Sequence, residues 1–328
     1  MAEFPKQAKV VIVGLGGIVG SSIAHHLIEL GWDDIVGLDK SAIPTDIGST
    51  SHASDFCYTT GADKFTAYTT QYSQQFFESR GNYVRCGGLE VARVDDDARM
   101  LELKRKIGQG KAFGSRVSLI SPAEAKAKFP LLAEDQIQGA LWDPDAGLVV
   151  PRSQKVAGDL VDEAVASGKL KAFPNTPALK IVVDAGRVIG VETRRGFIAS
   201  EKVVLSVGIW GPLLADQVGS KLPLMPLEHP LLFFGPYDEL TGSGQEIVYP
   251  LFRDQGNSSY VRDTGDPKTT EGGRVEWGYY ETEHPRLVHA RDIAAPETAR
   301  MSPSMRDLTL DQVMDAYEKA IEMTPILG

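Results

Sequence analysis

The stretch of sequence that decides the fold is residues 9–40, which read KVVIVGLGGIVGSSIAHHLIELGWDDIVGLDK. A β-branched run over residues 9–13 is followed by a glycine-dense turn and by an apolar segment at helical spacing that Gly31 ends. A second apolar run stops at Asp39, about 20 residues after the turn, where a dinucleotide-binding βαβ unit keeps its ribose ligand. The sequence therefore predicts a strand, a turn and a helix that together bind a dinucleotide.

The glycines of this turn have separate physical roles, because one permits the tight turn, one lets the pyrophosphate approach bare backbone, and one lets the helix pack close to the strand. Their register is irregular: counted back from Gly20, the pattern G-x-G-x-x-G falls on Gly17 and Leu15, and counted forward from Gly14 it falls on Gly16 and Val19. We therefore expect one extra residue in the turn. The predicted nucleotide contacts here are Gly14, Gly16, Gly17, Ile18, Val19, Asp39 and Lys40. The alternative is a tight turn that binds nothing.

The composition is that of a globular protein with an ample core. The chain has 328 residues, 42% of them hydrophobic, and a formal net charge of -10. This acidity argues against a nucleic-acid partner and against an anionic membrane surface, since both attract basic patches. The start of the chain lacks the layout of a signal peptide, so we expect a cytoplasmic protein. Cys57 and Cys86 form no CxxC pair, which favours two reduced thiols, and no metal-ligand motif is present.

Several further elements can be predicted along the chain. A polar Ser/Thr-rich loop that carries His52 follows Asp39 and should lie beside the nucleotide turn. Aromatic residues at helical spacing in the next segment predict a core-facing stripe; they are Phe65, Tyr68, Tyr72 and Phe76, with Thr69 among them. Residues 86–94 predict a strand, residues 100–107 a surface helix, and Ser121 with Glu124 a capping box that begins another helix.

The second half of the chain contains two kinds of segment, one with a helix and regular strands and one in which proline and glycine interrupt the strands. A helix over residues 153–166 precedes three short strands in a meander, and residues 202–211, KVVLSVGIWG, predict a buried central strand that ends in a glycine turn. From about residue 222, proline and glycine punctuate strand-like pieces, including residues 247–249, and these predict a mostly antiparallel second domain. Thr309 and Gln312 predict a capping box before a last helix with Leu310 on its apolar face.

With these pieces in place, the sequence resembles the flavin-dependent amine oxidoreductases of the D-amino-acid oxidase superfamily, most closely the dimethylglycine and sarcosine dehydrogenase group. Besides the opening βαβ unit, the motifs that carry the resemblance are GSTSHA at residues 48–53, GGLEVA at 87–92, DAGLVVP at 145–151 and SVGIWG at 206–211. The resemblance implies FAD as cofactor. It adds Gly48, Ser49, Thr50, Ser51, His52, Gly208, Trp210 and Gly211 to the expected cofactor contacts.

The fold class implied is α/β, with a Rossmann-like FAD-binding domain and a mostly antiparallel α+β substrate domain, of the glutathione-reductase or D-amino-acid-oxidase type. We expect the FAD-binding domain to comprise residues 6–85, 145–221 and 300–328, and the substrate domain residues 86–144 and 222–299. In the family a glycine-rich strand continues beyond the last helix and closes the FAD-binding domain. We therefore expect this chain to lack that closing segment and to be truncated or part of a longer protein.

The resemblance also assigns individual residues to chemistry. His52 stands where the dimethylglycine dehydrogenase group carries a histidine bonded covalently to the flavin 8α-methyl carbon; the alternative is a histidine that only hydrogen-bonds FAD. His229 and Tyr260 match residues on the substrate side of the flavin, where a group that accepts a proton favours the reactive neutral amine. Arg262 is a candidate for the substrate carboxylate, although a salt bridge to Asp263 or Asp266 is an equal alternative.

The predicted function is FAD-dependent oxidation of a small secondary or tertiary amine, such as oxidative N-demethylation of an N-methylated amino acid. The predicted partners are a small amine and an electron acceptor, either oxygen or an electron-transfer protein, with no nucleic acid or membrane. Two alternatives remain open. One is an NAD-dependent dehydrogenase, against which the Ser/Thr-rich loop and the meander count. The other is a catalytically inactive flavin-binding fragment.

Overall fold

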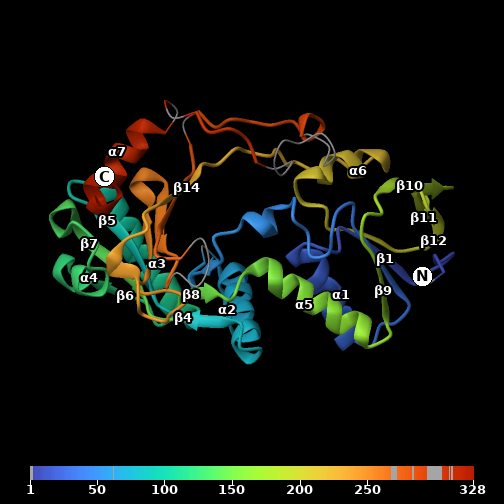
Figure 1. Cartoon of the computed structure of the whole chain (residues 1–328), viewed down its shortest axis with the longest axis horizontal. Helices are drawn as coiled ribbons and strands as arrows, with labels where there is room; N and C mark the ends of the chain where they lie inside the picture. The colour runs from blue at the N-terminus through green and yellow to red at the C-terminus, as the bar shows by residue number, and fades with distance from the viewer. Residues whose placement is uncertain are drawn as a thin grey trace. The chain divides into compact units, whose positions relative to one another are not determined.

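The computed structural model describes residues 3–61, 63–266, 272–282, 284–293, 305–309, 311 and 313–328. Its chain divides into two compact units (Figure 1). The first comprises residues 1–54, 152–227 and 287–307, and the second comprises residues 55–151, 228–286 and 308–328. Each unit is therefore assembled from three separate segments of the chain.

These boundaries differ from the domains that the sequence suggested. Residues 55–85, 145–151 and 308–328, which we assigned to the FAD-binding domain, belong to the second unit. The small strands account for the first two of these differences. β3 (Phe56–Cys57) and β4 (Tyr83–Arg85) both pair with β8 (Gly147–Val149), so they form one sheet of their own. Because that pairing is long-range, local sequence patterns do not reveal it.

The first unit is built on a parallel sheet with the order β13-β1-β2-β9. Its strands are β1 (Val10–Val13), β2 (Ile35–Leu38), β9 (Leu170–Phe173) and β13 (Val203–Leu205). The helices α1 (Ile18–Glu29) and α5 (Ser153–Ala166) lie side by side (Figure 1). Apolar residues of β1 and β2 are fully buried, which explains the continuous β-branched runs in the sequence.

Two other parts of the first unit were predicted in outline. The meander is a three-stranded antiparallel sheet of β10 (Ala178–Asp184), β11 (Arg187–Thr193) and β12 (Gly196–Ala199). β13 differs from the prediction of a buried central strand, because it lies at the end of the sheet order and its residues are only half-buried. It pairs in parallel with β1 alone, so one of its edges takes no part in this sheet.

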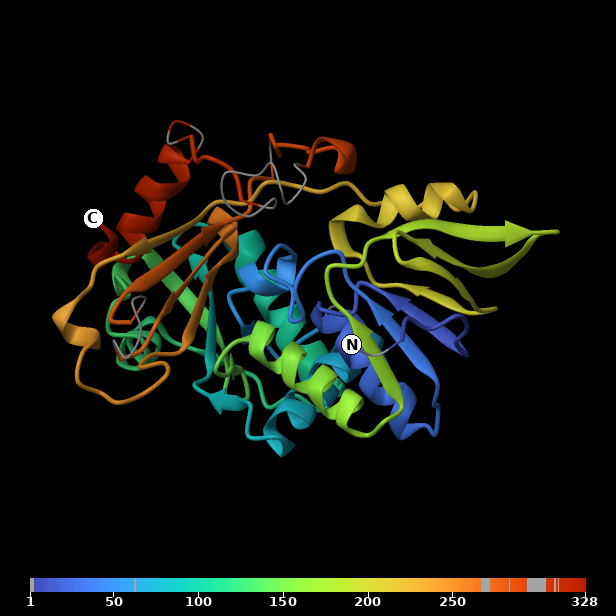
Figure 2. The same cartoon turned by 45° about the vertical axis from the view of Figure 1, so that its right-hand side comes forward.

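The second unit contains a seven-stranded sheet with the order β14-β17-β16-β15-β5-β7-β6, which is antiparallel except where β15 meets β5. The strands are β5 (Gly88–Arg93), β6 (Ser118–Ile120), β7 (Ile137–Asp143), β14 (Leu231–Phe234), β15 (Leu251–Asp254), β16 (Ser259–Asp263) and β17 (Val275–Tyr279). One face packs on α7 (Met314–Met323), drawn in red in Figure 2, with Trp277 fully buried at the centre of that core.

The remaining helices of the second unit confirm some predictions and change others. α3 (Asp97–Ala112) is longer than predicted, and α4 (Pro122–Lys128) begins at the predicted capping box. Residues 247–249, predicted as a strand, form none, because the carboxylate of Asp263 accepts the N–H groups of Val248 and Tyr249 in place of a neighbouring strand. Leu310 and Gln312, which belong to the last predicted capping helix, lie outside the described residues.

The predicted aromatic stripe is on a helix, but it is not a core face. α2 (Lys64–Ser79) leaves Phe65 and Tyr68 exposed by 75% and 65%. The residues of this helix that are buried are Ala67 and Gln74. The packed face is therefore the small and polar one, and aromatic spacing alone pointed to the wrong side.

Candidate functional site

The glycine-rich turn absorbs its extra residue where β1 ends. Gly14 has a φ of +90°, and the N–H groups of Gly14 and Leu15 both donate to the carbonyl of Leu38, at 2.8 and 3.0 Å. The Leu15 side chain is fully buried over Gly37 of β2, where an added Cβ would stand 2.3 Å from Leu15 Cδ2. The extra residue is therefore a bulge whose side chain fills the space above a glycine of the next strand.

The N-terminus of α1 presents bare backbone. Gly17 is its N-cap, and a Cβ added there would meet only the Thr50 Oγ1 atom, at 3.5 Å. At Gly20 there is no room for a side chain, because an added Cβ would lie 2.1 Å from the Gly14 carbonyl oxygen. These two glycines match two expected roles: open approach for a phosphate at Gly17, and close packing of helix on strand at Gly20.

The Ser/Thr-rich loop lies beside this helix N-terminus, as expected. Its 3-10 turn η1 (Ser49–His52) brings the Thr50 hydroxyl to the Ile18 N–H group, which donates to it at 3.1 Å. The neighbouring Val19 is exposed on the first turn of α1. The predicted contacts on the turn and on the loop are therefore grouped at one end of one helix.

Asp39 follows β2, and its side chain faces the same turn. Its Oδ2 accepts the Gly16 N–H at 2.8 Å, and its Oδ1 accepts the Ser41 N–H at 3.0 Å and the Ser41 hydroxyl at 3.1 Å. Burial raises the pKa of Asp39, and the N–H groups of Ser41 and Gly16 oppose that rise. A carboxylate has about four acceptor positions, so Asp39 retains capacity for a further donor such as a ribose hydroxyl.

The predicted cofactor contacts that follow β13 lie close to Lys40, the residue after Asp39. The Lys40 ammonium nitrogen is 3.1 Å from the centre of the Trp210 ring, a cation–π contact. Trp210 ends the 3-10 turn η3 (Gly208–Trp210), and Gly211 begins α6 (Gly211–Gln217). Gly208 has a φ of +52°, a conformation that favours glycine. The structure thus brings two distant motifs together in the first unit.

His52 ends η1 and is fixed through its Nδ1 atom. That atom lies 3.0 Å from the Gly48 carbonyl oxygen and 3.0 Å from the Ser51 hydroxyl. Because a carbonyl oxygen only accepts, the Nδ1 atom donates to it, and the neutral ring then carries its lone pair on Nε2. The Ser51 hydroxyl donates to the same carbonyl at 2.8 Å. This tautomer is the one in which Nε2 is nucleophilic.

The residues of the first unit fit a bound FAD. The open face at Gly17 suits a pyrophosphate on the α1 N-terminus, because the backbone N–H groups and the dipole of a helix N-terminus attract anions. Asp39 lies beyond the second strand with an acceptor position for a ribose hydroxyl. At Gly14 and Gly20, which a ligand does not need to approach, protein atoms occupy the space that a side chain would take.

In the second unit, Tyr260 belongs to an aromatic group on one face of the large sheet. Its ring lies over Gly278 of the adjacent strand, where an added Cβ would be 2.0 Å from a ring carbon. The ring centres of Phe56 and Tyr260 are 5.0 Å apart, and those of Tyr260 and Tyr280 are 5.7 Å apart. The absence of a side chain at Gly278 is therefore what allows Tyr260 to lie flat.

His229 joins this group at its outer end. Its ring centre is 4.6 Å from that of Tyr280, in an edge-to-face arrangement. Partial burial lowers the pKa of His229, so the imidazole is predominantly neutral at pH 7. The structure therefore brings the two predicted catalytic residues, His229 and Tyr260, into contact with one tyrosine ring, that of Tyr280.

Arg262 lies on the same sheet but is already paired. Its Nη2 atom is 2.8 Å from the Glu276 Oε2 atom, and both side chains are buried. The partner is thus neither of the aspartates that the sequence suggested. Arg262 also donates to the carbonyl oxygen of Asp263 at 3.3 Å. A substrate carboxylate would have to compete with Glu276 for this guanidinium.

Arg253, which lies on β15 next to the strand of Arg262, was not among the predicted site residues. Its guanidinium carbon lies 4.1 Å from the centre of the Tyr58 ring and 5.0 Å from that of the Phe56 ring. Tyr58 is fixed by donating its hydroxyl to the carbonyls of Leu89 and Leu251, at 2.9 and 3.1 Å. Only long-range strand pairing brings these rings to Arg253, so no local motif marks the site.

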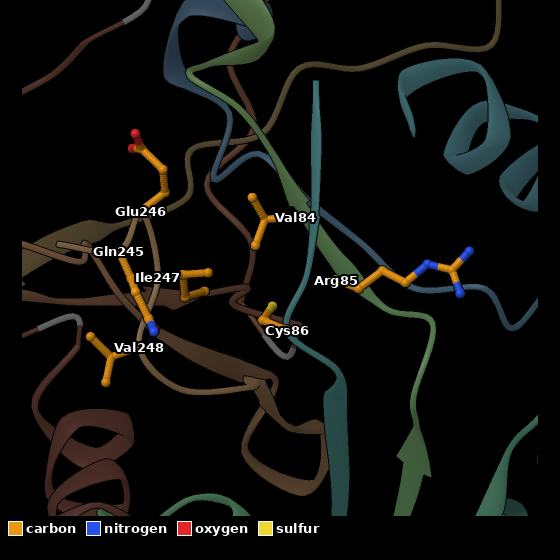
Figure 3. Close-up of a pocket in the computed structure, with 7 residues that line it drawn as sticks. All are labelled: Val84, Arg85, Cys86, Gln245, Glu246, Ile247 and Val248. Atoms are coloured by element: carbon orange, nitrogen blue, oxygen red, sulfur yellow. The ribbon is translucent and has the colours of Figure 1, made fainter. Parts of the chain in front are cut away.

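A separate pocket of about 420 Å³ lies between β4 and residues 245–248 in the second unit. Cys86 and Ile247 line it, while the Arg85 guanidinium points away from it (Figure 3). Burial raises the pKa of the Cys86 thiol to about 12 and that of Cys57 to about 11, so both cysteines remain thiols at neutral pH. The pocket contains none of the predicted site residues.

The described part of the chain contains neither a cluster of metal-binding side chains nor a helix that could span a membrane. No group of three or more His, Cys, Asp or Glu side chains within those residues is arranged to hold a metal ion. In the same part of the chain, no helix combines the length and the apolar character needed to cross a bilayer.

The fold and the first-unit site define a class: an α/β protein with a dinucleotide-binding βαβ unit and a second unit with a large, mostly antiparallel sheet. The DAO family, described as FAD dependent oxidoreductase, matches residues 9–327. The chain belongs to this family.

Individual proteins agree with that assignment. The chain is 26% identical over 332 residues to the mitochondrial dimethylglycine dehydrogenase of Rattus norvegicus, a match that covers 99% of this chain and 37% of that protein. It is 29% identical to the mitochondrial pyruvate dehydrogenase phosphatase regulatory subunit of Mus musculus, across 88% of this chain and 32% of that one. The chain therefore spans about a third of the length of these relatives.

Among solved structures, L-proline dehydrogenase from P. horikoshii is similar, with a TM-score of 0.79 and 22% sequence identity. The match covers 99% of this chain and 79% of that one. At this identity the likeness shows the fold. It confirms the prediction of a Rossmann-like domain combined with an antiparallel substrate domain.

Proposed function

We propose that the chain binds FAD in its first unit and oxidises a small secondary or tertiary amine, such as an N-methylated amino acid. The observation that carries this proposal is the open N-terminus of α1 at Gly17, with Asp39 and the Thr50 loop beside it. Membership of a family of FAD-dependent oxidoreductases and similarity to a dimethylglycine dehydrogenase support it.

When bound, FAD would accept a hydride equivalent from the carbon next to the amine nitrogen, leaving an imine that water hydrolyses to an aldehyde and the demethylated amine. The protein must supply the amine in its neutral form. His229, whose pKa is lowered by partial burial, is neutral at pH 7 and accepts the ammonium proton. Tyr260 positions the substrate through a ring that Gly278 holds flat against the sheet.

We assign the cofactor contacts as the residues of the glycine turn, Asp39 with Lys40, the loop over residues 48–52, and Gly208, Trp210 and Gly211. His52 attaches FAD covalently in this proposal. The Nδ1 atom donates to the Gly48 carbonyl, so the neutral ring has its lone pair on Nε2, as a nucleophile requires. A purely hydrogen-bonding His52 is the alternative.

Two measurements test these assignments. Acid precipitation of wild type should retain the yellow colour in the pellet, whereas His52→Ala should release it to the supernatant; colour in the supernatant of both would refute the covalent bond. Anaerobic mixing with N,N-dimethylglycine or N-methylglycine should bleach the flavin spectrum. A flavin that no N-methyl amino acid bleaches would refute amine oxidation.

A catalytically inactive flavin-binding protein is the second candidate, favoured by the similarity to a phosphatase regulatory subunit. The same bleaching experiment decides between the two, because an inactive protein would keep its oxidised spectrum with every amine. Bound nicotinamide in place of flavin would instead support the NAD-dependent alternative.

The electron acceptor and the compartment are further proposals. We propose oxygen or an electron-transfer protein as acceptor, which stopped-flow reoxidation with and without oxygen distinguishes. We expected a cytoplasmic protein, while both curated relatives are named as mitochondrial. Cell fractionation with antibodies against the chain tests this expectation.

A further inference from the structure

We propose that the aromatic stripe of α2, formed by Phe65, Tyr68, Tyr72 and Phe76, is a docking surface for a second copy of this chain, with the two α2 helices antiparallel across a two-fold axis. The inference does not depend on the proposed amine oxidation, because α2 carries none of the predicted site residues. It involves the second unit alone.

The aromatic stripe exposes a large apolar area to water. Phe65, Tyr68 and Tyr72 are exposed by 75%, 65% and 43%. Full burial of an aromatic side chain removes about 150–250 Å² from water, so these three rings would bury roughly 300–450 Å² per copy. A specific interface buries about 800 Å² per partner. The stripe therefore provides about half of such an interface, and an apolar patch of this size is characteristic of a binding surface.

α2 is attached to its own unit by another side of the helix. The Gln71 side-chain amide donates to the carbonyl oxygen of Phe113 and to the Ser115 hydroxyl, each at 3.1 Å. The buried residues of α2 lie away from the stripe, because residues at spacings of three and four share one face of a helix. The exposed rings of Phe65 and Tyr68 are thus not what holds α2 in place, whereas contact with a second molecule would remove them from water.

The charge of this surface favours a second copy as the occupant. Residues 65–77, FTAYTTQYSQQFF, include no charged side chain. Two copies of a chain with a formal net charge of -10 repel each other, so they associate best through a surface that has little charge of its own. A basic partner would instead be drawn to surfaces rich in carboxylates. The uncharged stripe therefore fits another copy of this chain better than it fits a basic protein.

The order of the aromatic residues along α2 suits pairing with itself. In a two-fold symmetric contact, residue i of one copy meets residue j of the other, and j meets i. With antiparallel helices centred on residues 70–71, Phe65 of one copy lies opposite Phe76 of the other, and Tyr68 lies opposite Tyr72. Each ring thus meets another ring, as edge-to-face and offset aromatic contacts require.

The charged residues near the two ends of α2 fit the same register. Lys64 and Glu78 are fourteen positions apart, about four helical turns, so both lie on one flank of the stripe. They are centred on residue 71, which brings Lys64 of each copy next to Glu78 of the other. Glu78 already pairs with Arg85 of its own chain, and the second cation extends that pair. Parallel helices would instead bring Lys64 next to Lys64, so the charges select the antiparallel arrangement.

Sedimentation velocity of the purified protein over a range of concentrations tests the proposal. Wild type should form a dimer, and Phe65→Asp/Tyr68→Asp should raise its dissociation constant at least about 30-fold, because two charges enter the contact. Leu101→Asp is the matched control: Leu101 is a comparably exposed apolar residue, at 69%, on α3 of the same unit, and its variant should dimerise like wild type. A monomeric wild type, or a dimer that Phe65→Asp/Tyr68→Asp leaves intact, would overturn the inference.

Disulfide cross-linking tests the direction of the helices and does not rely on variants that disrupt the dimer. Phe65→Cys and Phe76→Cys are oxidised with copper phenanthroline, which takes two electrons and two protons from each pair of thiols that it joins, either separately or as a mixture after subunit exchange. The mixture should give a covalent dimer, while each variant alone should give no more than wild type, whose Cys57 and Cys86 set the background. Leu101→Cys mixed with Phe76→Cys should also stay at background. A covalent dimer of Phe65→Cys alone, or no cross-link in the mixture, would contradict the antiparallel contact.

Discussion

At the scale of single residues, we expect alanine to have opposite effects at Gly17 and Gly20, although the two glycines are only three positions apart. At Gly17 it should weaken FAD binding, and at Gly20 it should destabilise the fold. Gly17→Ala adds a methyl group that meets only the Thr50 hydroxyl oxygen, so the fold should lose less than about 1 kcal/mol. The same methyl group occupies the approach of the pyrophosphate, and FAD affinity should fall at least tenfold. Fluorescence titration with FAD, together with urea unfolding of the apoprotein, measures both quantities.

Gly20→Ala is the control for this prediction. Its methyl group would lie 2.1 Å from a backbone carbonyl oxygen, which cannot move without disturbing β1. The expected loss of stability is about 3 kcal/mol or more. If Gly17→Ala instead lost as much stability as Gly20→Ala, or bound FAD as tightly as wild type, the open face at Gly17 would not be the phosphate site.

The lowered pKa of His229 leads to a prediction about how kcat/KM depends on pH. A histidine whose pKa is lowered stays neutral, and able to accept a proton, down to pH values below its ordinary value of about 6.5. We therefore expect kcat/KM to fall only below about pH 6.5 in wild type. His229→Gln should lower the plateau roughly 10²-fold and remove this acid limb. An acid limb at the same position in the variant would exclude His229 as the group that titrates.

At the scale of elements, the bulge in the glycine turn fits only because the Leu15 side chain fills the space that the missing side chain of Gly37 leaves. Leu15→Ala empties a fully buried position and should cost about 2–4 kcal/mol. Gly37→Ala should also destabilise, because its methyl group collides with Leu15. In the double variant the new methyl group enters the vacated space, so the combined loss should be at least about 1 kcal/mol less than the sum. Additive losses in urea unfolding would contradict this packing.

Asp145 connects separate elements by charge and gives a prediction about acid stability. The Arg116 and Arg85 guanidinium groups hold the pKa of Asp145 below its ordinary value, with Arg116 the larger cause. A lowered pKa stabilises the fold above the unfolded-state value of about 3.9 and loses that effect as pH falls below it.

Asp145→Asn should therefore destabilise by about 1 kcal/mol at pH 7 and by less at pH 3, where wild type has lost part of the same interaction. Urea midpoints at the two pH values measure this difference. A destabilisation that is equal at both would show that Asp145 acts by shape and neutral hydrogen bonds.

The helices and strands also show how much of the fold could be predicted from the sequence. Strand, turn and helix at residues 9–40, the α5 helix and the capping box at Ser121 follow local rules of periodicity and capping, and the structure confirms them. The aromatic stripe of α2 follows the same periodicity, yet its packed face is that of Ala67 and Gln74. Spacing identifies a helix; which side is buried depends on partners distant in sequence.

The candidate site divides in the same way. The grouping of Gly17, Asp39 and the Thr50 loop was predictable because these residues lie close together in the chain. The aromatic contacts of Arg253 were not, since Phe56 and Tyr58 reach it only through long-range folding. The Arg262 partner was also missed, because Glu276 is the residue opposite it on β17, whereas local sequence offered Asp263 and Asp266.

At the scale of the whole molecule, the two units should respond to different ligands. In hydrogen exchange, FAD should protect amides of β1, the turn and the start of α1, whereas N-methylglycine should protect β16, which carries Tyr260. A ligand present at about 100 times its Kd stabilises the fold that binds it by about 2.7 kcal/mol, which is enough to see. Protection of β16 by FAD alone, or of β1 by N-methylglycine alone, would contradict the assignment of ligands to units.

The parallel sheet of the first unit has a consequence for how the protein is made. β1 leaves the ribosome before its neighbour β13: Ser206, which directly follows β13 and donates to Val13, is 193 positions further on. At roughly 5–20 residues per second, translation leaves one apolar edge of β1 uncovered for about 10–40 s. The yield of native protein should therefore depend on how well chaperones of the host shield β1 of the nascent chain during that interval.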